Sequence, residues 1–316
     1  MTRRILIVAN PHRPETLEAG DEVARVLTDA GIESCTDFTA GVSEPIEAAI
    51  VLGGDGTMLH AARKTHGTDI PLLGVNLGRV GFLAELERED VASAAQRLAA
   101  GDYTVEERRT LHVTVTGPDG AEQHGWALNE ATLERANRLR TLEVMLAVDG
   151  EPLSSFGCDG LVVATATGST AHAFSAGGPV LWPDVDALLL VPLAAHALFA
   201  RPLVVGPQSS FAIQVVPGSE SSGQVVLDGA RSILVERGGV VDIRRGDHTV
   251  KLARMSDAPF TSRLVQKFSL PTDGWRGERS HPKPIGREIH GDAWPVAEEP
   301  VDAPTPTRAG GPDEDG

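Results

Sequence analysis

Residues 53–57 read Gly-Gly-Asp-Gly-Thr and combine features that suit phosphoryl transfer. The glycines at Gly53, Gly54 and Gly56 let the backbone approach an anion closely and adopt positive φ angles, and a helix beginning here adds partial positive charge. The carboxylate of Asp55 would repel a bare phosphate, which indicates that it holds a metal or accepts a proton from an attacking hydroxyl. The alternative is a tight turn in which Asp55 only caps the helix. The segment is neither a Walker motif nor a Rossmann fingerprint.

A second candidate site follows the strand-like run at 161–164. Small and hydroxyl residues occupy 165–170, and a short helix is then ended by Gly-Gly-Pro at 177–179. Small residues leave room for a flat base, while hydroxyl and N–H groups can hydrogen-bond to its edge. The segment indicates a nucleotide site, with an ordinary Gly/Thr loop as the alternative.

Two short polar segments could complete such a site. Asn129 and Glu130 are adjacent, and an amide can pair with adenine while a carboxylate accepts hydrogen bonds from ribose hydroxyls. The alternative for this pair is a solvated strand end. Asp228 precedes Gly229, and because Asp-Gly is also a common hairpin signal, this segment indicates a site only together with the others.

The elements that must position these residues fall into two groups. Apolar runs at 4–9 and 48–52 predict buried strands, and a helix is expected between them at 15–30; such alternation indicates a parallel sheet. After about residue 108, short strand-like runs separated by Gly and Pro predict an antiparallel sandwich. Its expected strands include 111–116, 141–148, 161–164, 202–205, 211–216, 224–227, 240–244 and 249–254.

We therefore predict an α/β domain followed by an all-β domain. The expected ranges are a Rossmann-like domain at 1–108, a β-sandwich domain at 109–258 and a segment at 259–275 that packs back on the body. Residues 276–316 are rich in Pro, Gly and acidic side chains and are expected to be a disordered tail.

Charge and cysteine usage restrict the partners. With 28 Lys and Arg against 44 Asp and Glu, the net charge is −16, so no basic face for nucleic acid or an anionic membrane is expected. Only Cys35 and Cys158 occur, and the apolar run before Asn10 is too short for a signal sequence. The sequence predicts a cytoplasmic protein.

Taken together, these segments resemble the NAD kinase family, and WALNE and AFSAGGPVLWPD resemble its actinobacterial members. The matching motifs, in the family's order and approximate spacing, are GGDGTML at 53–59, GVNLGRVGFLAE at 74–85, LNE at 128–130, DGLVVATATGSTAHAFSAGGPVL at 159–181 and LDG at 227–229. The resemblance covers roughly residues 4–275. It implies an N-terminal Rossmann-like domain, a C-terminal NAD-binding β-sandwich, an active site between them, and a homodimer or homotetramer.

The implied reaction transfers a phosphoryl group from ATP or inorganic polyphosphate to the 2′-hydroxyl of the adenosine ribose of NAD, giving NADP, with a divalent metal expected to be Mg²⁺. Asp55 matches the catalytic aspartate, and the donor loop comprises Gly53, Gly54, Gly56 and Thr57. The residues that the resemblance assigns to NAD are Asp55, Gly56, His60, Phe82, Asn129, Glu130, Arg140, Asp159, Thr170, Ala171, His172, Ala173, Phe174, Ser175 and Asp228.

Two of these residues depart from the family pattern. His172 stands where the family usually has Tyr; imidazole offers a smaller stacking face and can become cationic, so nucleotide affinity or its pH dependence is expected to differ. His60 stands where relatives often carry Arg or Lys, and a neutral His would bind phosphate less strongly. The alternative for His60 is a solvated helix residue.

Three other functions compete with this interpretation. A lipid kinase or sugar-phosphate kinase can share the Gly-Gly-Asp-Gly turn, but it does not explain the pair Asn129–Glu130 or the hydroxyl-rich loop. A non-catalytic NAD(H) or NADP(H) sensor would be favoured by loss of Asp55, which is present. A dehydrogenase is disfavoured because no Rossmann fingerprint is found.

Overall fold

The structure is a computed structural model that describes residues 3–39, 45–78, 81–197, 200–256 and 258–271. The described residues up to Leu270 belong to one compact unit. The expected tail at 276–316 lies outside the described residues. Within the described ranges, no helix combines the length and apolarity needed to cross a membrane.

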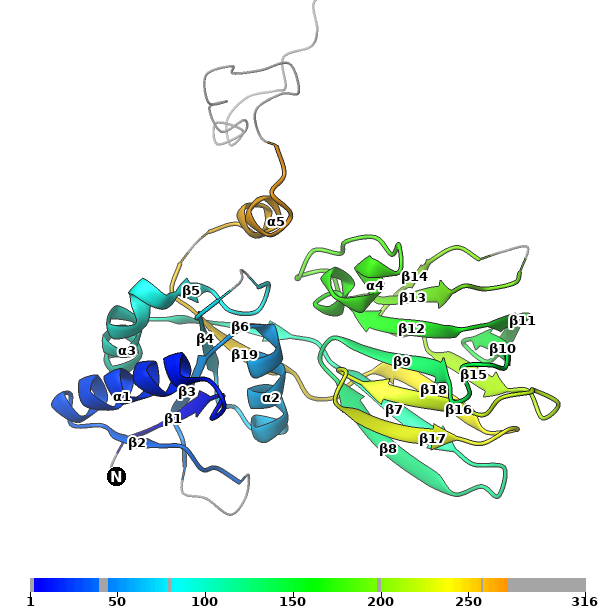
Figure 1. Ribbon diagram of the computed structural model, residues 1–316, viewed down its shortest axis with the longest axis horizontal. Helices are drawn as coiled ribbons and strands as arrows, with labels where there is room; N and C mark the ends of the chain where they lie inside the picture. Colours follow the sequence, from blue (N-terminus) through cyan, green and yellow to red (C-terminus); the bar gives the residue numbers. More distant parts are fainter. Residues whose placement is uncertain (1–2, 40–44, 79–80, 198–199, 257, 272–316) are drawn as a thin grey trace, which may run out of the picture. The chain divides into compact units, whose positions relative to one another are not determined.

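The N-terminal part of the chain forms a seven-stranded sheet in the order β2-β1-β3-β4-β19-β6, with β5 paired to β4 (Figure 1). All its pairs are parallel except β19 with β6. The elements are β1 (Arg4–Ala9), α1 (Pro14–Asp29), β2 (Glu33–Cys35), β3 (Ala48–Leu52), α2 (Asp55–Thr65), β4 (Leu72–Asn76), β5 (Leu86–Glu87), η1 (Arg88–Asp90), α3 (Val91–Ala100), β6 (Thr104–Arg108) and β19 (Val250–Arg254).

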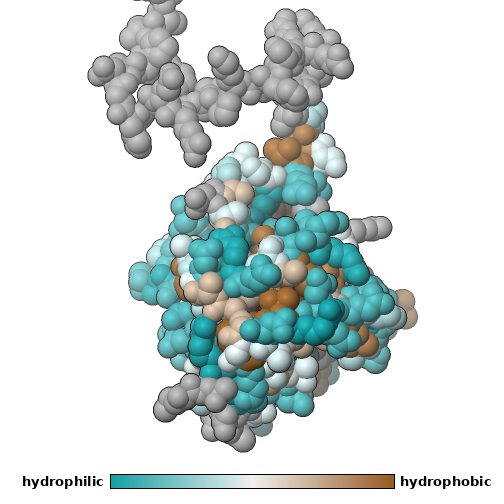
Figure 2. Space-filling model, turned by 90° about the vertical axis from the view of Figure 1, so that its left-hand side faces the viewer, coloured by the Kyte–Doolittle hydropathy of each residue, from teal (hydrophilic) through white to brown (hydrophobic). Residues whose placement is uncertain are grey.

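This sheet is covered by helices on both faces, which explains its continuous apolar strands. Ile5 and Ile7 of β1 pack in a cluster with α1 and α3, whereas Leu6 and Val8 pack in a second cluster with α2. Figure 1 shows α1 and α3 on one side of the sheet and α2 on the other. The face of the molecule seen in Figure 2 is mostly hydrophilic, with a small hydrophobic area in its middle.

One strand lies in a different sheet from the one expected. Residues 249–254 were predicted within the sandwich domain at 109–258, but β19 pairs with β4 and β6 of the first sheet. The chain therefore returns to the N-terminal sheet after completing the sandwich. Its apolar alternation predicts a strand but does not say which strand pairs with it, because that choice depends on residues far away in the sequence.

The middle of the chain forms two six-stranded antiparallel sheets, β11-β10-β15-β18-β7-β8 and β14-β13-β12-β9-β16-β17. The strands of the first are β7 (Leu111–Thr116), β8 (Glu122–Ala127), β10 (Leu142–Val148), β11 (Glu151–Cys158), β15 (Phe211–Val215) and β18 (Val240–Arg245). Those of the second are β9 (Glu130–Arg135), β12 (Gly160–Thr165), β13 (Leu188–Leu193), β14 (Leu203–Val205), β16 (Gly223–Leu227) and β17 (Arg231–Val235).

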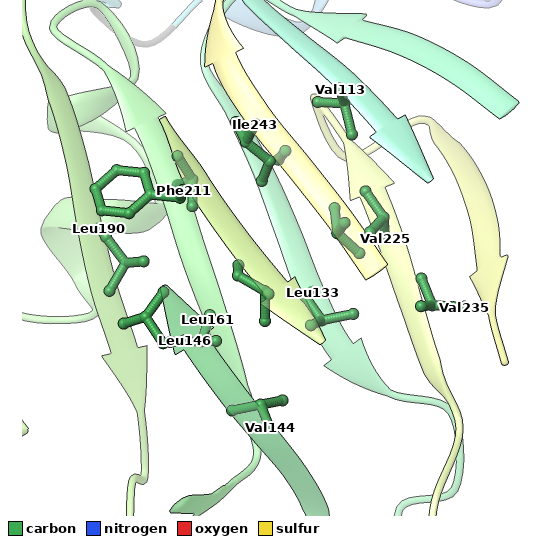
Figure 3. Packing of buried hydrophobic residues seen from close by; sticks show 14 of the residues in the cluster. Val113, Leu133, Val144, Leu146, Leu161, Leu190, Phe211, Val225, Val235 and Ile243 are labelled. Atoms are coloured by element: carbon green, nitrogen blue, oxygen red, sulfur yellow. The ribbon is translucent and has the colours of Figure 1, made fainter. Parts of the chain in front are cut away.

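Alternate residues of both sheets meet in one core (Figure 3). Phe211 and Ile243 come from one sheet, and Leu161 and Leu190 from the other. The α/β domain followed by a β-sandwich is thus confirmed as the fold class.

Strand β12 is buried on both faces, and its outer face fixes the segment that follows it. Val162 and Ala164 pack against Ala173 of the short helix α4 (His172–Ser175), which follows the single turn η2 (Gly168–Thr170). A final helix, α5 (Phe260–Phe268), ends the ordered elements of the described chain.

Candidate active site

The segment at 53–57 is a strand–turn–helix junction, as predicted. Gly53 has a φ of 148°, and a Cβ there would lie 3.0 Å from Cβ of Thr57, so both conformation and space require glycine. Its N–H donates to the carbonyl of Val75 at 2.9 Å, which ties the turn to β4. Gly54 is the N-cap of α2, and its carbonyl accepts hydrogen bonds from the N–H groups of Thr57 and Met58.

A cavity of about 870 Å³ opens at the carboxyl ends of β1, β3 and β4. Open parallel sheets bind ligands at this edge. The lining residues are Ala9, Asn10, Pro11, His12, Arg13, Thr16, Gly53, Gly54, Gly56, Thr57, His60, Asn76, Leu77 and Gly78. The N-termini of α1 and α2 lie at the cavity with Arg13 and two histidines, and this arrangement suits an anion.

The sequence prediction missed the wall formed by residues 10–13. These residues follow a buried strand directly, as the glycine segment does, and that position was the signal that could have identified them. The wall is a tight turn in which the Arg13 N–H donates to the carbonyl of Asn10 at 3.1 Å and the Thr16 hydroxyl donates to the same carbonyl at 2.6 Å.

His60 lines this cavity one turn after the glycine segment. Its Nδ1 lies 2.9 Å from Nη2 of Arg63, and a guanidinium can only donate, so Nδ1 accepts and the neutral ring carries its proton on Nε2. Burial, Arg63 and Lys64 all lower the pKa of His60. A neutral imidazole at this position can donate one hydrogen bond to a phosphate but adds no charge.

The Asp55 carboxylate is bound by a distant segment. The Phe82 N–H lies 3.1 Å from each of its oxygens, and the Leu83 N–H donates to Oδ1 at 3.0 Å. Its hydrogen bonds thus run to the backbone of 82–83, so the helix-cap alternative does not describe this residue. Both groups hold the carboxylate beside the glycine turn and fix its orientation.

Asn129 and Glu130 are buried with unused polar atoms. The Asn129 Oδ1 and the Glu130 Oε2 have no hydrogen-bond partner among the described residues. Burial, followed by the charge of Asp228, raises the pKa of Glu130 to about 7, although a backbone hydrogen bond from His172 opposes the shift. Buried polar atoms are normally satisfied, so this pair has the character of a site that a polar ligand completes.

Asp228 holds the backbone beside Asn129 and Glu130. Its carboxylate accepts hydrogen bonds from the N–H groups of Leu128 at 3.0 Å and Asn129 at 2.7 Å, and from Arg231 at 3.2 Å. Burial raises the pKa of Asp228. In this structure Asp228 holds the backbone of the 128–130 segment, and its predicted contact with the ribose stays a prediction.

The loop after β12 lies beside the same pair. The Thr165 hydroxyl donates to the carbonyl of Leu128 at 2.7 Å, and a Cβ at Gly168 would overlap the backbone of Asn129. Nδ1 of His172 lies 3.3 Å from the hydroxyl of Thr132. The hydroxyl of Ser169 is used internally, since it donates to Ala166 and accepts from the N–H of Leu181. The residues predicted at 170–175 therefore follow a loop anchored to Asn129.

Several contacts join the two halves of the candidate site. Leu83 and Leu128 share one buried cluster with the helix that carries Asp55. Nη1 of the buried Arg108 lies 3.4 Å from the hydroxyl of Thr167. The rings of Phe82 and Phe174 both contact Phe268 of α5, at centroid distances of 5.7 and 4.6 Å.

Two residues that were predicted to bind NAD lie away from the rest of the candidate site. Asp159 lies just before the first residue of β12, whereas Glu130 pairs with Ala164 near the last residue of that strand. At the rise of a β-strand, Asp159 and Glu130 are therefore about 15–20 Å apart. Asp159 forms an ion pair with Arg135 at 2.8 Å. Arg140 follows the far end of β9 and lies 3.6 Å from Glu220. The structure does not bring these two residues to Asp55 or Glu130.

The described residues contain no cluster of three or more His, Cys, Asp or Glu side chains that could hold a metal ion. The described part of the chain therefore offers no cage of carboxylate, imidazole or thiol groups for a cation near Asp55. Mg²⁺ commonly binds through substrate phosphates and one or two carboxylates, so this donor set fits a metal that arrives with a phosphate chain.

Sequence comparisons agree with this geometry. Residues 35–103 match the family model for the ATP-NAD kinase N-terminal domain, and residues 128–255 match that for the ATP-NAD kinase C-terminal domain. A NAD kinase of Leifsonia xyli subsp. xyli is 51% identical over 295 residues, which cover 87% of this chain and 97% of that protein. A NAD kinase of Corynebacterium jeikeium is 53% identical over 299 residues, covering 88% and 91%.

The chain belongs to the NAD kinase family. It is therefore a kinase, that is, a phosphotransferase, and the predicted resemblance is confirmed. Family membership removes the lipid kinase, sensor and dehydrogenase alternatives.

Solved structures give the same fold. A yeast NADH kinase complexed with NADH superimposes with a TM-score of 0.79 at 20% identity, covering 88% of this chain and 90% of that one. A NAD kinase from Archaeoglobus fulgidus in complex with ATP gives a TM-score of 0.68 at 25% identity, covering 86% and 100%.

Proposed function

We propose that this protein transfers a phosphoryl group from ATP or inorganic polyphosphate to the 2′-hydroxyl of the adenosine ribose of NAD, giving NADP. One observation carries the proposal: a single fixed carboxylate, Asp55, belongs to the turn that lines the cavity, and the helix that it begins shares a buried cluster with Leu128, next to the buried pair Asn129 and Glu130 with their unused oxygens. The cavity suits the donor phosphates, and the pair suits the nucleoside of the acceptor.

In the proposed reaction, Asp55 accepts the hydrogen bond of the 2′-hydroxyl and then its proton. The sugar oxygen forms a bond to the transferred phosphorus while the bond from phosphorus to the donor's bridging oxygen breaks. Phosphoryl transfer is largely dissociative, so alignment contributes more than proton removal. The two N–H groups on the Asp55 carboxylate support this, because they fix its orientation before substrate arrives.

Asn129 and Glu130 are proposed to hold the nucleoside, with 170–175 closing around it. The donor phosphates are proposed to lie in the cavity against the loop of Gly53, Gly54, Gly56 and Thr57 and beside His60. A divalent metal, Mg²⁺, would neutralise the donor phosphates when bound. The relative from Archaeoglobus fulgidus, solved in complex with ATP, supports a nucleotide donor.

A homo-oligomer is part of the proposal. Asp159 and Arg140 match family positions that contact NAD, yet they lie at the far ends of β12 and β9 from Glu130. A second copy of the chain could bring them to a bound NAD. Both cysteines are free, which supports a reducing, cytoplasmic location. Light scattering of the purified protein tests the oligomer; a monomer with full activity would refute it.

The activity is tested with purified protein, Mg²⁺, NAD or NADH, and either ATP or polyphosphate. A coupled NADP-dependent dehydrogenase reports the product. We expect NADP only when both a donor and the acceptor are present. Absence of NADP with every donor would refute the function, whereas product from one donor alone would decide the donor.

A further inference from the structure

The three residues 81–83 contact the catalytic carboxylate on more than one side. The N–H groups of Phe82 and Leu83 bind it. A Cβ added to Gly81 would overlap Oδ1 of Asp55 and lie 2.8 Å from its Cγ and 3.0 Å from its Oδ2. A side chain at position 81 would therefore collide with the carboxylate of Asp55.

Two arginines bind the carbonyl groups of this segment. Nη1 of Arg263, on α5, donates to the carbonyl of Phe82 at 3.2 Å. Nη1 of Arg254, on β19, lies 3.4 Å from the carbonyl of Leu83, and Nε of the same side chain pairs with Glu106 at 2.6 Å. Both arginines come from the last part of the described chain, more than 150 residues after Asp55.

One peptide group connects Arg263 with Asp55. The carbonyl of Phe82 and the N–H of Leu83 belong to the same peptide unit; the first accepts from Arg263 and the second donates to Asp55. Consecutive hydrogen bonds through a peptide group polarise one another. Arg263 therefore acts on the carboxylate through this peptide, without touching it.

We propose that Gly81 and Arg263 are positioning residues that set the place of the Asp55 carboxylate, with Gly81 leaving the space and Arg263 holding the peptide that binds it. This inference rests on the proposed function of Asp55. The three nearest described atoms to a Cβ at Gly81, its chain neighbours aside, all belong to the Asp55 side chain, which can rotate away. Gly81→Ala should therefore fold normally and lose activity.

The test compares Gly81→Ala with the control Gly206→Ala, where an added Cβ meets no atom within 4 Å. A misplacement of about 1 Å at a reacting group costs on the order of 100-fold in rate. We expect kcat of Gly81→Ala to fall by about 100-fold with the KM for NAD and the melting temperature close to those of the wild type. Unchanged kcat, or a fall accompanied by a large loss of thermal stability, would overturn the role of Gly81.

A double-variant cycle separates positioning from a general structural effect. In Asp55→Ala the atoms that collide with the new Cβ are gone, so adding Gly81→Ala should change the residual rate by less than about 2-fold if the two residues act as one unit. A further fall of about 100-fold in that background would show that Gly81 acts independently of Asp55 and would overturn the inference.

Arg263 is tested by Arg263→Met and Arg263→Lys. We expect Arg263→Met to lower kcat by about 10-fold or more, in the range of a charge-assisted hydrogen bond, and Arg263→Lys to restore part of it with the KM for NAD unchanged. Equal kcat in all three proteins would refute the role of Arg263. If the wild type itself makes no NADP, the proposed function fails instead, so the two failures are distinguishable.

Discussion

Glu130 makes a quantitative prediction about pH. Its carboxyl has an ordinary pKa of 4.5, and in the folded protein burial and the neighbouring Asp228 raise the pKa to about 7. Below about pH 4.5 the group is protonated in both the folded and the unfolded chain and contributes no pH dependence. Between about pH 4.5 and 7 the unfolded chain binds fewer protons than the folded one, so the stability of the folded protein falls as pH rises.

The size of the effect follows from the two pKa values. One pKa unit corresponds to about 1.4 kcal/mol, so integrating between pH 5 and pH 8 gives a loss of about 2 to 3 kcal/mol attributable to Glu130. In Glu130→Gln this titration is absent, while the side chain keeps its shape. The free energy of unfolding of the variant should therefore gain about 2 to 3 kcal/mol relative to the wild type between pH 5 and pH 8.

The assay is urea unfolding of both proteins at pH 5 and pH 8, at one protein concentration and without ligand. Other titrating groups are common to both proteins and cancel in the difference. Parallel stability of wild type and Glu130→Gln across this range would refute the raised pKa that burial and Asp228 give Glu130.

Three further predictions concern the proposed catalytic residue, the cavity wall and the core. Asp55→Asn should lower kcat by about 100-fold or more while the calorimetric Kd for NAD stays near that of the wild type; equal turnover would contradict the assignment. Arg13→Ala should raise the KM for the donor by about 10-fold, the value of one charge-assisted hydrogen bond, and leave the KM for NAD unchanged; an effect on NAD alone would place the acceptor in the cavity. Phe211, fully buried between the two sheets of the sandwich, should cost about 3–5 kcal/mol of unfolding free energy when changed to Ala, as urea unfolding would show; a loss below about 1 kcal/mol would contradict its place in the core.

Much of the site could be predicted from local pattern. A buried strand followed by glycines and a helix is encoded by neighbouring residues, and the structure shows this junction at Gly53–Asp55. The pair Asn129–Glu130 was weak evidence by itself, because the sequence does not show whether a carboxylate is buried. The structure shows this pair buried with unused oxygens, and that burial raises the pKa of Glu130.

Amino-acid order determined the family, the α/β and β-rich halves, and the glycine turn that carries Asp55, because each depends on residues close together along the chain. Tertiary structure decided that β19 joins the first sheet, that the backbone of 82–83 binds the Asp55 carboxylate, and that Asp159 lies far from Glu130. These features depend on which distant segments pack together. A strand pattern does not specify its partner and a carboxylate does not specify its donor, so only the folded chain determines them.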